Sequence, residues 1–343
     1  MAGEIFVTKP NPVIVEVTRG TGVESWHSGS AVVVKADGRI VAAWGEFTRS
    51  VFPRSAIKPL QALPLIESGA AEHFRVTDQE IALACASHSG EPIHTRLVSA
   101  WLRRLGLHAT DLVCGPHTPL CDEAAKAVLR DRREPTPIHN NCSGKHAGFL
   151  TTALRMNVPA KSYADPDGSV QRRVLEALSD MGECDLTTAM RGTDGCGVPV
   201  VAMPLDAIAL AMARLGRPDG LPKVRRSAAA RILAAVTRYP YLVAGNARFD
   251  TEVMAKNEGL VVIKGGAEGV CAASLPALGL GLAVKIDDGA KRAAETAMAT
   301  LLARFPSADG RAYAGMGPFL RRPIYNTAGV HVGDIRAAEG WPD

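Results

Sequence analysis

The sequence predicts an α+β fold in which strands from both ends of the chain form one antiparallel sheet and the middle of the chain is helical. Strand-like runs occupy residues 13–44 and return after residue 260, whereas apolar residues between these regions recur at helical spacing. Hydrophobic residues make up 47% of the 343 residues, which is sufficient for a large buried core. Because no repeat, low-complexity tract or clear linker interrupts the sequence, we expect residues 1–343 to form a single unit.

The N-terminal strands are predicted at residues 13–18, 31–35 and 39–44. Asp37 and Gly38 separate the last two runs, and an Asp-Gly pair between two strands is a signal for a tight β-hairpin. The chain is therefore expected to open with an antiparallel meander.

A helix is predicted to start at Ser55, because an apolar run at helical spacing follows it and ends at Gly69. Pro59 fits within the first turn of a helix, but Pro64 is expected to bend the helix or end it early. Ser55 is thus placed where a loop meets a helix, next to the free backbone N–H groups and the positive end of the helix dipole.

A second helix is predicted after Thr77, since Thr77 and Glu80 match a capping box ahead of an apolar run. This helix should run towards Ala86 and place Ser87 at its far end. Helical spacing predicts further helices at residues 93–105, 123–130, 145–156, 170–181, 205–215, 223–238 and 290–305. Strands are predicted again at residues 260–264, 280–286 and 330–335.

Charge and composition exclude several classes of protein. The net charge is only +4, and the arginine pairs are scattered along the chain, so we expect no nucleic-acid partner. The N-terminus lacks the pattern of a secretory signal, and no apolar stretch approaches membrane-spanning length, so we expect a soluble, cytoplasmic protein with no membrane partner. The seven cysteines are odd in number and form no C-x-x-C pair, which argues against a disulfide framework.

Ser55 and Lys58 form an S-x-x-K pattern, in which side chains three residues apart share one face of a helix. A serine hydroxyl becomes a good nucleophile when a base takes its proton, and a lysine is such a base when its surroundings keep it neutral. The pattern therefore indicates acyl transfer through a serine ester. On spacing alone, it also fits an exposed serine and lysine on an ordinary helix.

Four further segments combine reactive side chains with glycine, which is typical of loops that carry function. They are residues 86–91, 139–146, 193–199 and 264–269. The order of S-x-x-K, a loop serine and then a strand ending in Lys-Gly is similar to the three-element pattern of serine β-lactamases and penicillin-binding proteins. Ser87 and Lys264 would take the second and third positions, although the chain has no S-D-N motif and carries Lys-Gly-Gly in place of K-T-G.

A second resemblance covers nearly the whole chain, from about residue 13 to residue 333. The sequence resembles the asparaginase II family, the rhizobial-type L-asparaginases, in five motifs that occur in the same order. They are PRSAIKP at 53–59, CASHSGE at 85–91, CGPH at 114–117, NNCSGKH at 140–146 and DGCG at 194–197. The resemblance implies a fold like that of serine β-lactamases and glutaminases, a homodimer, and hydrolysis of L-asparagine to L-aspartate and ammonia.

The same resemblance implies two catalytic serine–lysine tandems, Ser55 with Lys58 and Ser87 with Lys264. It also implies a zinc site close to these serines, with Cys142, Lys145 and Cys196 as ligands and Asp194 nearby. Two thiolates are good zinc ligands, whereas a lysine must first lose its proton. The separation of the two cysteines matches no standard zinc pattern, so from the residues alone they would be interpreted as buried structural cysteines.

As a mechanism we expect Ser55 to attack the side-chain amide carbon of asparagine while Lys58 takes the serine proton. Lys264 and Lys145 are the neighbouring cations expected to favour a neutral Lys58. Ser87 and Lys264 would relay protons, or Ser87 would itself be the nucleophile, and the sequence leaves both open.

Four further side chains are candidates for substrate binding: Arg54, His88, Asp194 and His146. Arg54 could hold the substrate α-carboxylate through two hydrogen bonds, and the histidines could orient water or substrate.

Two other functions fit the sequence. The first is another cytosolic Ser–Lys amidohydrolase, such as a glutaminase or a small amidase, with the same catalytic residues and a different pocket. The second is a non-catalytic zinc-binding protein in which Cys142 and Cys196 are structural.

Overall fold

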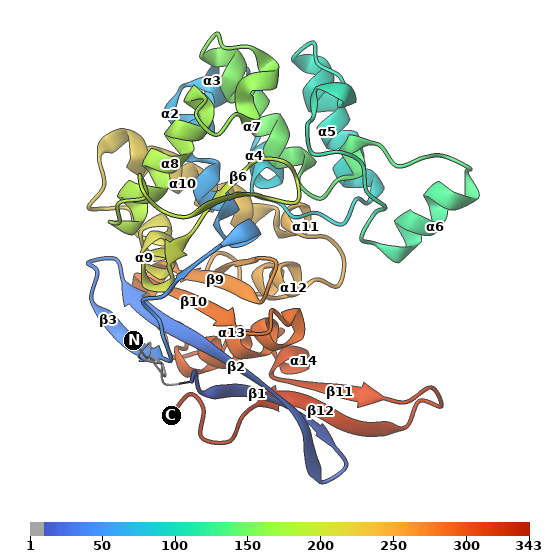
Figure 1. Cartoon of the computed structure of the whole chain (residues 1–343), viewed down its shortest axis with the longest axis vertical. Coiled ribbons are helices and arrows are strands. Elements are labelled where there is room, and N and C mark those ends of the chain that lie inside the picture. The colour runs from blue at the N-terminus through green and yellow to red at the C-terminus, as the bar shows by residue number, and fades with distance from the viewer. Residues whose placement is uncertain (1–9) are drawn as a thin grey trace, which may run out of the picture.

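The computed structural model describes residues 10–343, and an antiparallel sheet of eight strands lies at its centre (Figure 1). Residues 1–9, which the expected single unit also includes, lie outside the described residues. The strands follow the order β11-β12-β1-β2-β10-β9-β8, and β3 also pairs with β2. Their bounds are β1 (Val13–Arg19), β2 (Gly22–Lys35), β3 (Ile40–Trp44), β8 (Val262–Gly265), β9 (Val270–Leu275), β10 (Leu280–Ile286), β11 (Arg321–Tyr325) and β12 (His331–Ala337).

The two ends of the chain meet in this sheet. Strand β1 pairs antiparallel with β12, so that Val17 lies opposite Ile335. Strand β2 joins this half of the sheet to β10, with Val32 opposite Ala283. The predicted α+β class and the predicted antiparallel sheet built from both termini are therefore confirmed.

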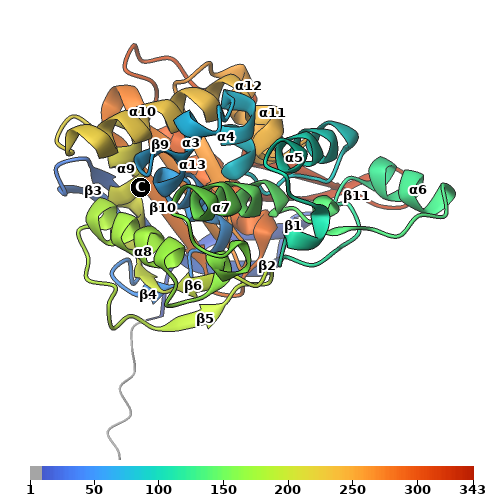
Figure 2. The same ribbon diagram turned by 90° about the horizontal axis from the view of Figure 1, so that it is seen from above.

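Helices pack on both faces of the sheet (Figures 1 and 2). Along β2, Val32 and Val34 face the core that is shared with the helical half, whereas Ala31 and Val33 face the core under α13. This alternation follows from the two-residue period of a strand. Gly281 on β10 allows α9 to approach closely, because a β-carbon there would lie 1.9 Å from the carbonyl oxygen of Ala209.

The middle of the chain is helical, as predicted. Its helices are α1 (Lys58–Gln61), α2 (Leu63–Glu67), α3 (Ala70–His73), α4 (Asp78–Ala84), α5 (Pro92–Arg104), α6 (Asp122–Arg130), α7 (Ser143–Arg155), α8 (Ser169–Gly182), α9 (Leu205–Gly216), α10 (Lys223–Arg238), α11 (Pro240–Val243) and α12 (Phe249–Lys256). Helices α13 (Lys291–Arg304) and α14 (Gly317–Leu320) follow the last central strands. Two short ribbons, β4 (Ser50–Val51) with β7 (Met203–Pro204) and β5 (Arg191–Thr193) with β6 (Pro199–Val201), flank the helical half.

The segment after Ser55 is a series of short helices rather than one long helix. A 3₁₀ turn at Arg54–Ile57 leads into α1, and α2 begins after a break at Ala62. Pro64 occupies the first turn of α2, where its missing N–H removes no helical hydrogen bond. The predicted effect of Pro64 is confirmed, and the capping box at Thr77 and Glu80 is also present at the start of α4.

Among residues 10–343, no helix is both long enough and apolar enough to cross a membrane.

Candidate active site

A cavity of about 440 Å³ lies where the helical half meets the β8 edge of the sheet. Ser55 and Ser87 both line it, together with Asn141 and Arg248. The remaining wall consists of residues 265–267, three residues of α13 and five others, which are Leu120, Phe249, Asp250, Val270 and Cys271. The two serines that the sequence predicted as catalytic thus reach one cavity, although 32 positions separate them in the chain.

Ser55 lies in a turn with an unusual backbone. The preceding residue, Arg54, has a φ of 51°, in the left-handed region that non-glycine residues seldom adopt. This turn packs directly against the end of β8, because a β-carbon at Gly266 would lie 2.8 Å from the carbonyl oxygen of Pro53. The glycine therefore allows the Ser55 turn to contact the strand that carries Lys264.

Lys58 is fully buried and donates three hydrogen bonds. Its Nζ lies 2.5 Å from the carbonyl oxygen of Ala86, 2.9 Å from Ser87 Oγ and 3.1 Å from Cys142 Sγ. Because the hydroxyl of Ser87 can donate as well as accept, this set of partners also accommodates an amine that acts as a proton acceptor. Lys58 therefore connects the Ser87 loop to the start of α7 without exposure to solvent.

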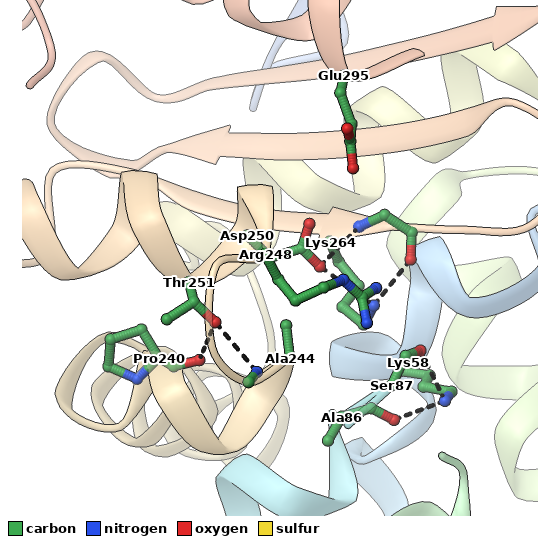
Figure 3. Close-up of polar contacts among 12 residues, drawn as sticks. Lys58, Ala86, Ser87, Pro240, Ala244, Arg248, Asp250, Thr251, Lys264 and Glu295 are labelled. Atoms are coloured by element: carbon green, nitrogen blue, oxygen red, sulfur yellow. Dashed lines mark hydrogen bonds and ion pairs between the residues drawn. The ribbon is translucent and has the colours of Figure 1, made fainter. Parts of the chain in front are cut away.

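Lys264 is the second buried amine of the site. Its Nζ donates to the carbonyl oxygen of Gly265 at 2.7 Å and lies 3.4 Å from Asp250 Oδ2 (Figure 3). Burial lowers the pKa of Lys264 to about 8, and the charges of Lys58 and Arg248 add to this effect while Asp250 opposes it. Burial acts to raise the pKa of Asp250, but Lys264 and Arg248 outweigh it, so this pKa lies below its ordinary value. Lys264 is thus an amine that reaches its neutral form near pH 8.

The lysine contacts differ from the tandems that the resemblance implied. Among the side-chain hydrogen bonds of residues 10–343, Lys58 Nζ is bonded to Ser87 and not to Ser55. Within the same residues Lys264 is bonded to Asp250 rather than to Ser87. The reason is geometric: Ser55 sits in a 3₁₀ turn ahead of α1, whereas the Ser87 loop crosses directly over the Lys58 amine.

Cys142, Lys145 and Cys196 lie together beside Lys58, each almost fully buried. Lys145 Nζ is 3.0 Å from Cys196 Sγ, and a hydrogen bond from Cys196 holds the pKa of the Cys142 thiol well below its ordinary value. That hydrogen bond, together with burial, raises the pKa of Cys196. Burial disfavours the charged form of Lys145, but the neighbouring sulfurs and Asp194 more than offset it, so its pKa is raised. Without a metal, these shifts favour a charged Lys145 amine and place the more acidic thiol on Cys142 rather than on Cys196, the sulfur that Lys145 contacts.

The same three side chains bring two sulfur atoms and one nitrogen atom together in a buried cluster. Sulfur and nitrogen are ligand atoms that zinc prefers, so these residue types fit a zinc site. No group of three or more His, Cys, Asp or Glu side chains gathers as a metal site within residues 10–343. The thiol pair would therefore depend on Lys145 as its third ligand, and this amine would have to lose its proton on metal binding.

Arg54 and Asp194, both predicted as substrate-binding residues, bind each other. Arg54 Nε donates to Asp194 Oδ1 at 2.7 Å, and the backbone N–H of Gly195 donates to the same oxygen at 2.8 Å. Burial alone would raise the pKa of Asp194, but Lys145 and Arg54 lower it, so the pair is ionic. Arg54 thus stabilises the loop that carries Cys196.

The two predicted histidines are buried within the helical half. His88 Nε2 lies 2.8 Å from Ser143 Oγ, and its Nδ1 accepts the N–H of Gly90 at 3.1 Å. His146 Nδ1 lies 2.6 Å from the Tyr163 hydroxyl. Burial holds the pKa of both histidines well below the ordinary value, so both are neutral.

Two residues of the site were not predicted from the sequence. Arg248 and Asp250 both line the cavity, and Asp250 also contacts Lys264. The available signal was the turn pair Gly245-Asn246 followed by an acidic helix start, which marks the loop but not its proximity to Ser87. Arg248 and Asp250 reach the cavity because α12 packs against β8, and this contact between distant segments depends on the tertiary structure.

Two serines at one cavity with two buried lysines behind them define a serine-dependent hydrolase. The family model of L-asparaginase II matches residues 15–337. The chain therefore belongs to the L-asparaginase II family, and its class is that of an amidohydrolase.

Solved structures similar to this chain include β-lactamases. One from Mycobacterium bovis is 15% identical with a TM-score of 0.41, covering 81% of this chain and 94% of that one. A class C β-lactamase from Rhodobacter sphaeroides is 15% identical with a TM-score of 0.40, covering 78% and 91%. A structure of Mglu, in its native form in 4.3 M NaCl, is 12% identical with a TM-score of 0.42, covering 88% and 66%. No curated protein sequence matches the chain.

Proposed function

We propose that the protein is an L-asparaginase that hydrolyses L-asparagine to L-aspartate and ammonia through a serine ester. The observation that carries this proposal is the meeting of Ser55 and Ser87 at one cavity, with the buried amine of Lys58 bonded to Ser87. Membership of the L-asparaginase II family supports the choice of an amide as substrate.

In the first step Ser55 Oγ attacks the side-chain amide carbon of asparagine. The Ser55 proton passes to the Ser87–Lys58 pair, and the leaving nitrogen takes up a proton to depart as ammonia. Backbone N–H groups of the turn that carries Ser55 would stabilise the oxyanion of the tetrahedral intermediate. The bond between carbon and nitrogen is thereby exchanged for an aspartyl ester on Ser55.

In the second step a water molecule attacks the ester carbon and releases aspartate. Lys264 is the amine suited to accept the water proton, because its pKa of about 8 leaves a substantial neutral fraction near neutral pH. Ser87 lines the same cavity and would pass a proton to Ser55 Oγ as the ester breaks. The hydroxyl of Ser55 is restored when the ester breaks.

Cys142, Lys145 and Cys196 would hold a zinc ion in this proposal. When bound, zinc would supply Lewis-acid chemistry at this cluster. In the chain itself, the cluster positions Lys58 through the contact with Cys142 Sγ.

The assembly and location proposed with this function are a homodimer in the cytoplasm, acting on a small molecule. All seven cysteines are free thiols, which suits a reducing compartment. Light scattering on a size-exclusion column tests the dimer, and a mass of one chain at micromolar concentration would contradict it.

The first experiment measures ammonia release from L-asparagine by the purified protein and by Ser55→Ala prepared in the same way. We expect release that disappears in the variant, together with a mass increase on Ser55 of the intact enzyme when the reaction is stopped with acid. Labelling of Ser87 instead would reverse the two serine roles. Absence of release by the intact protein would contradict the proposed function.

The alternative within the same class is a glutaminase or small amidase, which the same machinery would permit. Measuring the turnover of asparagine, glutamine and a chromogenic β-lactam side by side distinguishes these candidate functions. The proposal requires asparagine to have the highest kcat/KM of the three.

A further inference from the structure

We infer that Arg248 binds the α-carboxylate of the substrate and that Ser89 and Glu91 position it. This inference rests on the proposed function and concerns how the same site recognises its substrate. The guanidinium of Arg248 lies near the Asp250–Lys264 pair and lowers the pKa of both groups, and in the view of Figure 3 it is drawn on the side of that pair nearer to Ser87 and Lys58. Arg248 also lines the cavity that Ser55 and Ser87 share.

The loop that presents Arg248 has a fixed and unfavourable backbone. Gly245 has a φ of 116° and Ala247 a φ of 54°, and the second of these is costly for a residue with a side chain. Such strain persists only where surrounding contacts fix the loop. Arg248 itself is the N-cap of α12, where its backbone is extended and its side chain makes no capping hydrogen bond.

The second sequence motif supplies the contacts that fix this loop. Ser89 Oγ donates to the carbonyl oxygen of Ala244 at 2.8 Å, and Glu91 Oε1 accepts the backbone N–H of Asn246 at 3.0 Å. The other oxygen of Glu91 accepts the hydroxyl of Tyr241. Residues 87–91 therefore present Ser87 to the cavity and at the same time hold the loop of Arg248.

Arg248 has donors free for a ligand. Its one side-chain hydrogen bond within residues 10–343 is a long contact of 3.4 Å from Nη1 to Ser89 Oγ, and no ion pair holds it there. The residue is half-buried and lines the cavity together with Ser55 and Ser87. An arginine in this state offers a planar fork that matches a carboxylate.

Arg54, the sequence-based candidate for this role, has its guanidinium already bound to Asp194. The other cation at the cavity, Lys291, is largely exposed on α13 and pairs with Glu295. The amide carbon and α-carboxylate of asparagine are joined through three carbon–carbon bonds of about 1.5 Å each. Arg248 contacts the Ser89 hydroxyl, and Ser89 is two residues from Ser87. A substrate of this length could therefore place its amide at the serines and its α-carboxylate at Arg248.

The test compares asparagine with 3-aminopropanamide, which has the same amide and amine but no carboxylate. For Arg248→Met we expect kcat/KM on asparagine to fall about 10- to 100-fold, the usual effect of losing a charged hydrogen bond. Most of this loss should appear in KM. The kcat/KM on 3-aminopropanamide should change less than about threefold, because the uncharged end makes no bond with Arg248.

Arg248→Lys keeps the charge without the fork and should give an intermediate loss on asparagine. The exposed Arg130→Met on α6 is the matched control and should leave both substrates unchanged. Equal losses on both substrates in Arg248→Met, or no loss on either, would overturn the inference.

Titration calorimetry with L-aspartate makes the inference independent of turnover. Binding by the intact protein that is lost in Arg248→Met supports the inference even if asparagine is not hydrolysed. Equal binding by both proteins, or binding by neither, contradicts it.

The positioning role of Glu91 is tested by a ratio: the kcat/KM for asparagine divided by the kcat/KM for 3-aminopropanamide. Glu91→Gln should lower this ratio in the intact protein but not in Arg248→Met, because the carboxylate effect passes through Arg248. A fall of the same size in both backgrounds would show a general structural role instead.

Discussion

Lys58 Nζ donates a hydrogen bond to Ser87 Oγ at 2.9 Å, although 29 positions separate the two residues in the chain. This contact joins the S-x-x-K turn to the loop after α4, and Ser55 lines the cavity without a side-chain hydrogen bond to any residue in the range 10–343. Because the amine has no solvent exposure, any proton that it gives or takes must pass through Ser87, Cys142 or the substrate. The Ser87 hydroxyl is thus the natural link between Lys58 and the cavity.

Replacing Lys58 with Met is expected to lower kcat on asparagine by about 10²- to 10⁴-fold, the range for loss of an acid–base group. The cause would be loss of the proton acceptor behind Ser87. Lys126→Met, on the exposed side of α6, serves as the control and should retain full activity. Circular dichroism and gel filtration of both variants exclude unfolding as the explanation, and a folded Lys58→Met enzyme with unchanged kcat would contradict the role.

The pKa of Lys264, at about 8, predicts the pH dependence of activity. An amine that accepts a proton must be neutral, so kcat/KM should rise with pH through about 8 and then level off. Asp250→Asn removes the carboxylate that favours the ammonium form, which should move the rising limb to lower pH. A kcat/KM profile from pH 6 to 10, measured for the intact protein and for Asp250→Asn, checks both expectations. If the rising limb does not shift in the variant, a group other than Lys264 causes it.

The same lowered pKa predicts a stability difference between pH 8 and pH 10. In the unfolded chain Lys264 regains an ordinary pKa of about 10.4, so between these values the unfolded state binds more protons than the folded state. The contribution of Lys264 to the free energy of unfolding should therefore increase as pH rises across this interval. Urea denaturation at both pH values, with Lys264→Met as the reference, should show a smaller increase in the variant.

Local sequence signals predicted most of the elements because each depends on neighbouring residues. The capping box at Thr77, the Asp37-Gly38 hairpin and the apolar spacing of residues 223–238 all reappear in the structure. Strand β9 was missed because all six of its residues are buried, so it shows no alternation between polar and apolar residues. Strand β11 was missed for a different reason, since it is short and lies at the edge of the sheet.

The sequence pointed to several residues that line or lie behind the cavity, but not to Arg248 or Asp250 and not to the contacts among these residues. The motifs identified Ser55, Ser87 and Lys58, because these residue types at these spacings carry chemistry by themselves. Which serine meets which lysine depends on how the loop after α4 crosses α1, and no local pattern encodes that crossing. Arg248 lies outside every motif, and its importance follows only from contacts with Ser89 and the cavity.

The cluster of Cys142, Lys145 and Cys196 predicts one zinc ion per chain. Dialysis of the metal-free protein against zinc, followed by elemental analysis, should give one equivalent that is lost in Cys142→Ser and in Cys196→Ser. Cys184→Ser, a half-buried free thiol just after α8, is the matched control and should retain the metal. Unfolding on chelation would favour a structural zinc instead.

Gly144 is expected to be essential for the packing of α7 against α4. A β-carbon at this position would lie 2.3 Å from the carbonyl oxygen of Leu83, and backbone atoms of α4 cannot move aside locally. Gly144→Ala should therefore lower the free energy of unfolding by about 1–3 kcal/mol or more, as expected for overpacking, despite the higher helix propensity of alanine. Gly220→Ala meets no atom within 4 Å and should have little effect. Urea denaturation of the two variants measures the difference, and equal stabilities would show that the two helices can separate. Because Gly144 adjoins Lys145 in the same turn, zinc affinity should also fall in Gly144→Ala and not in Gly220→Ala.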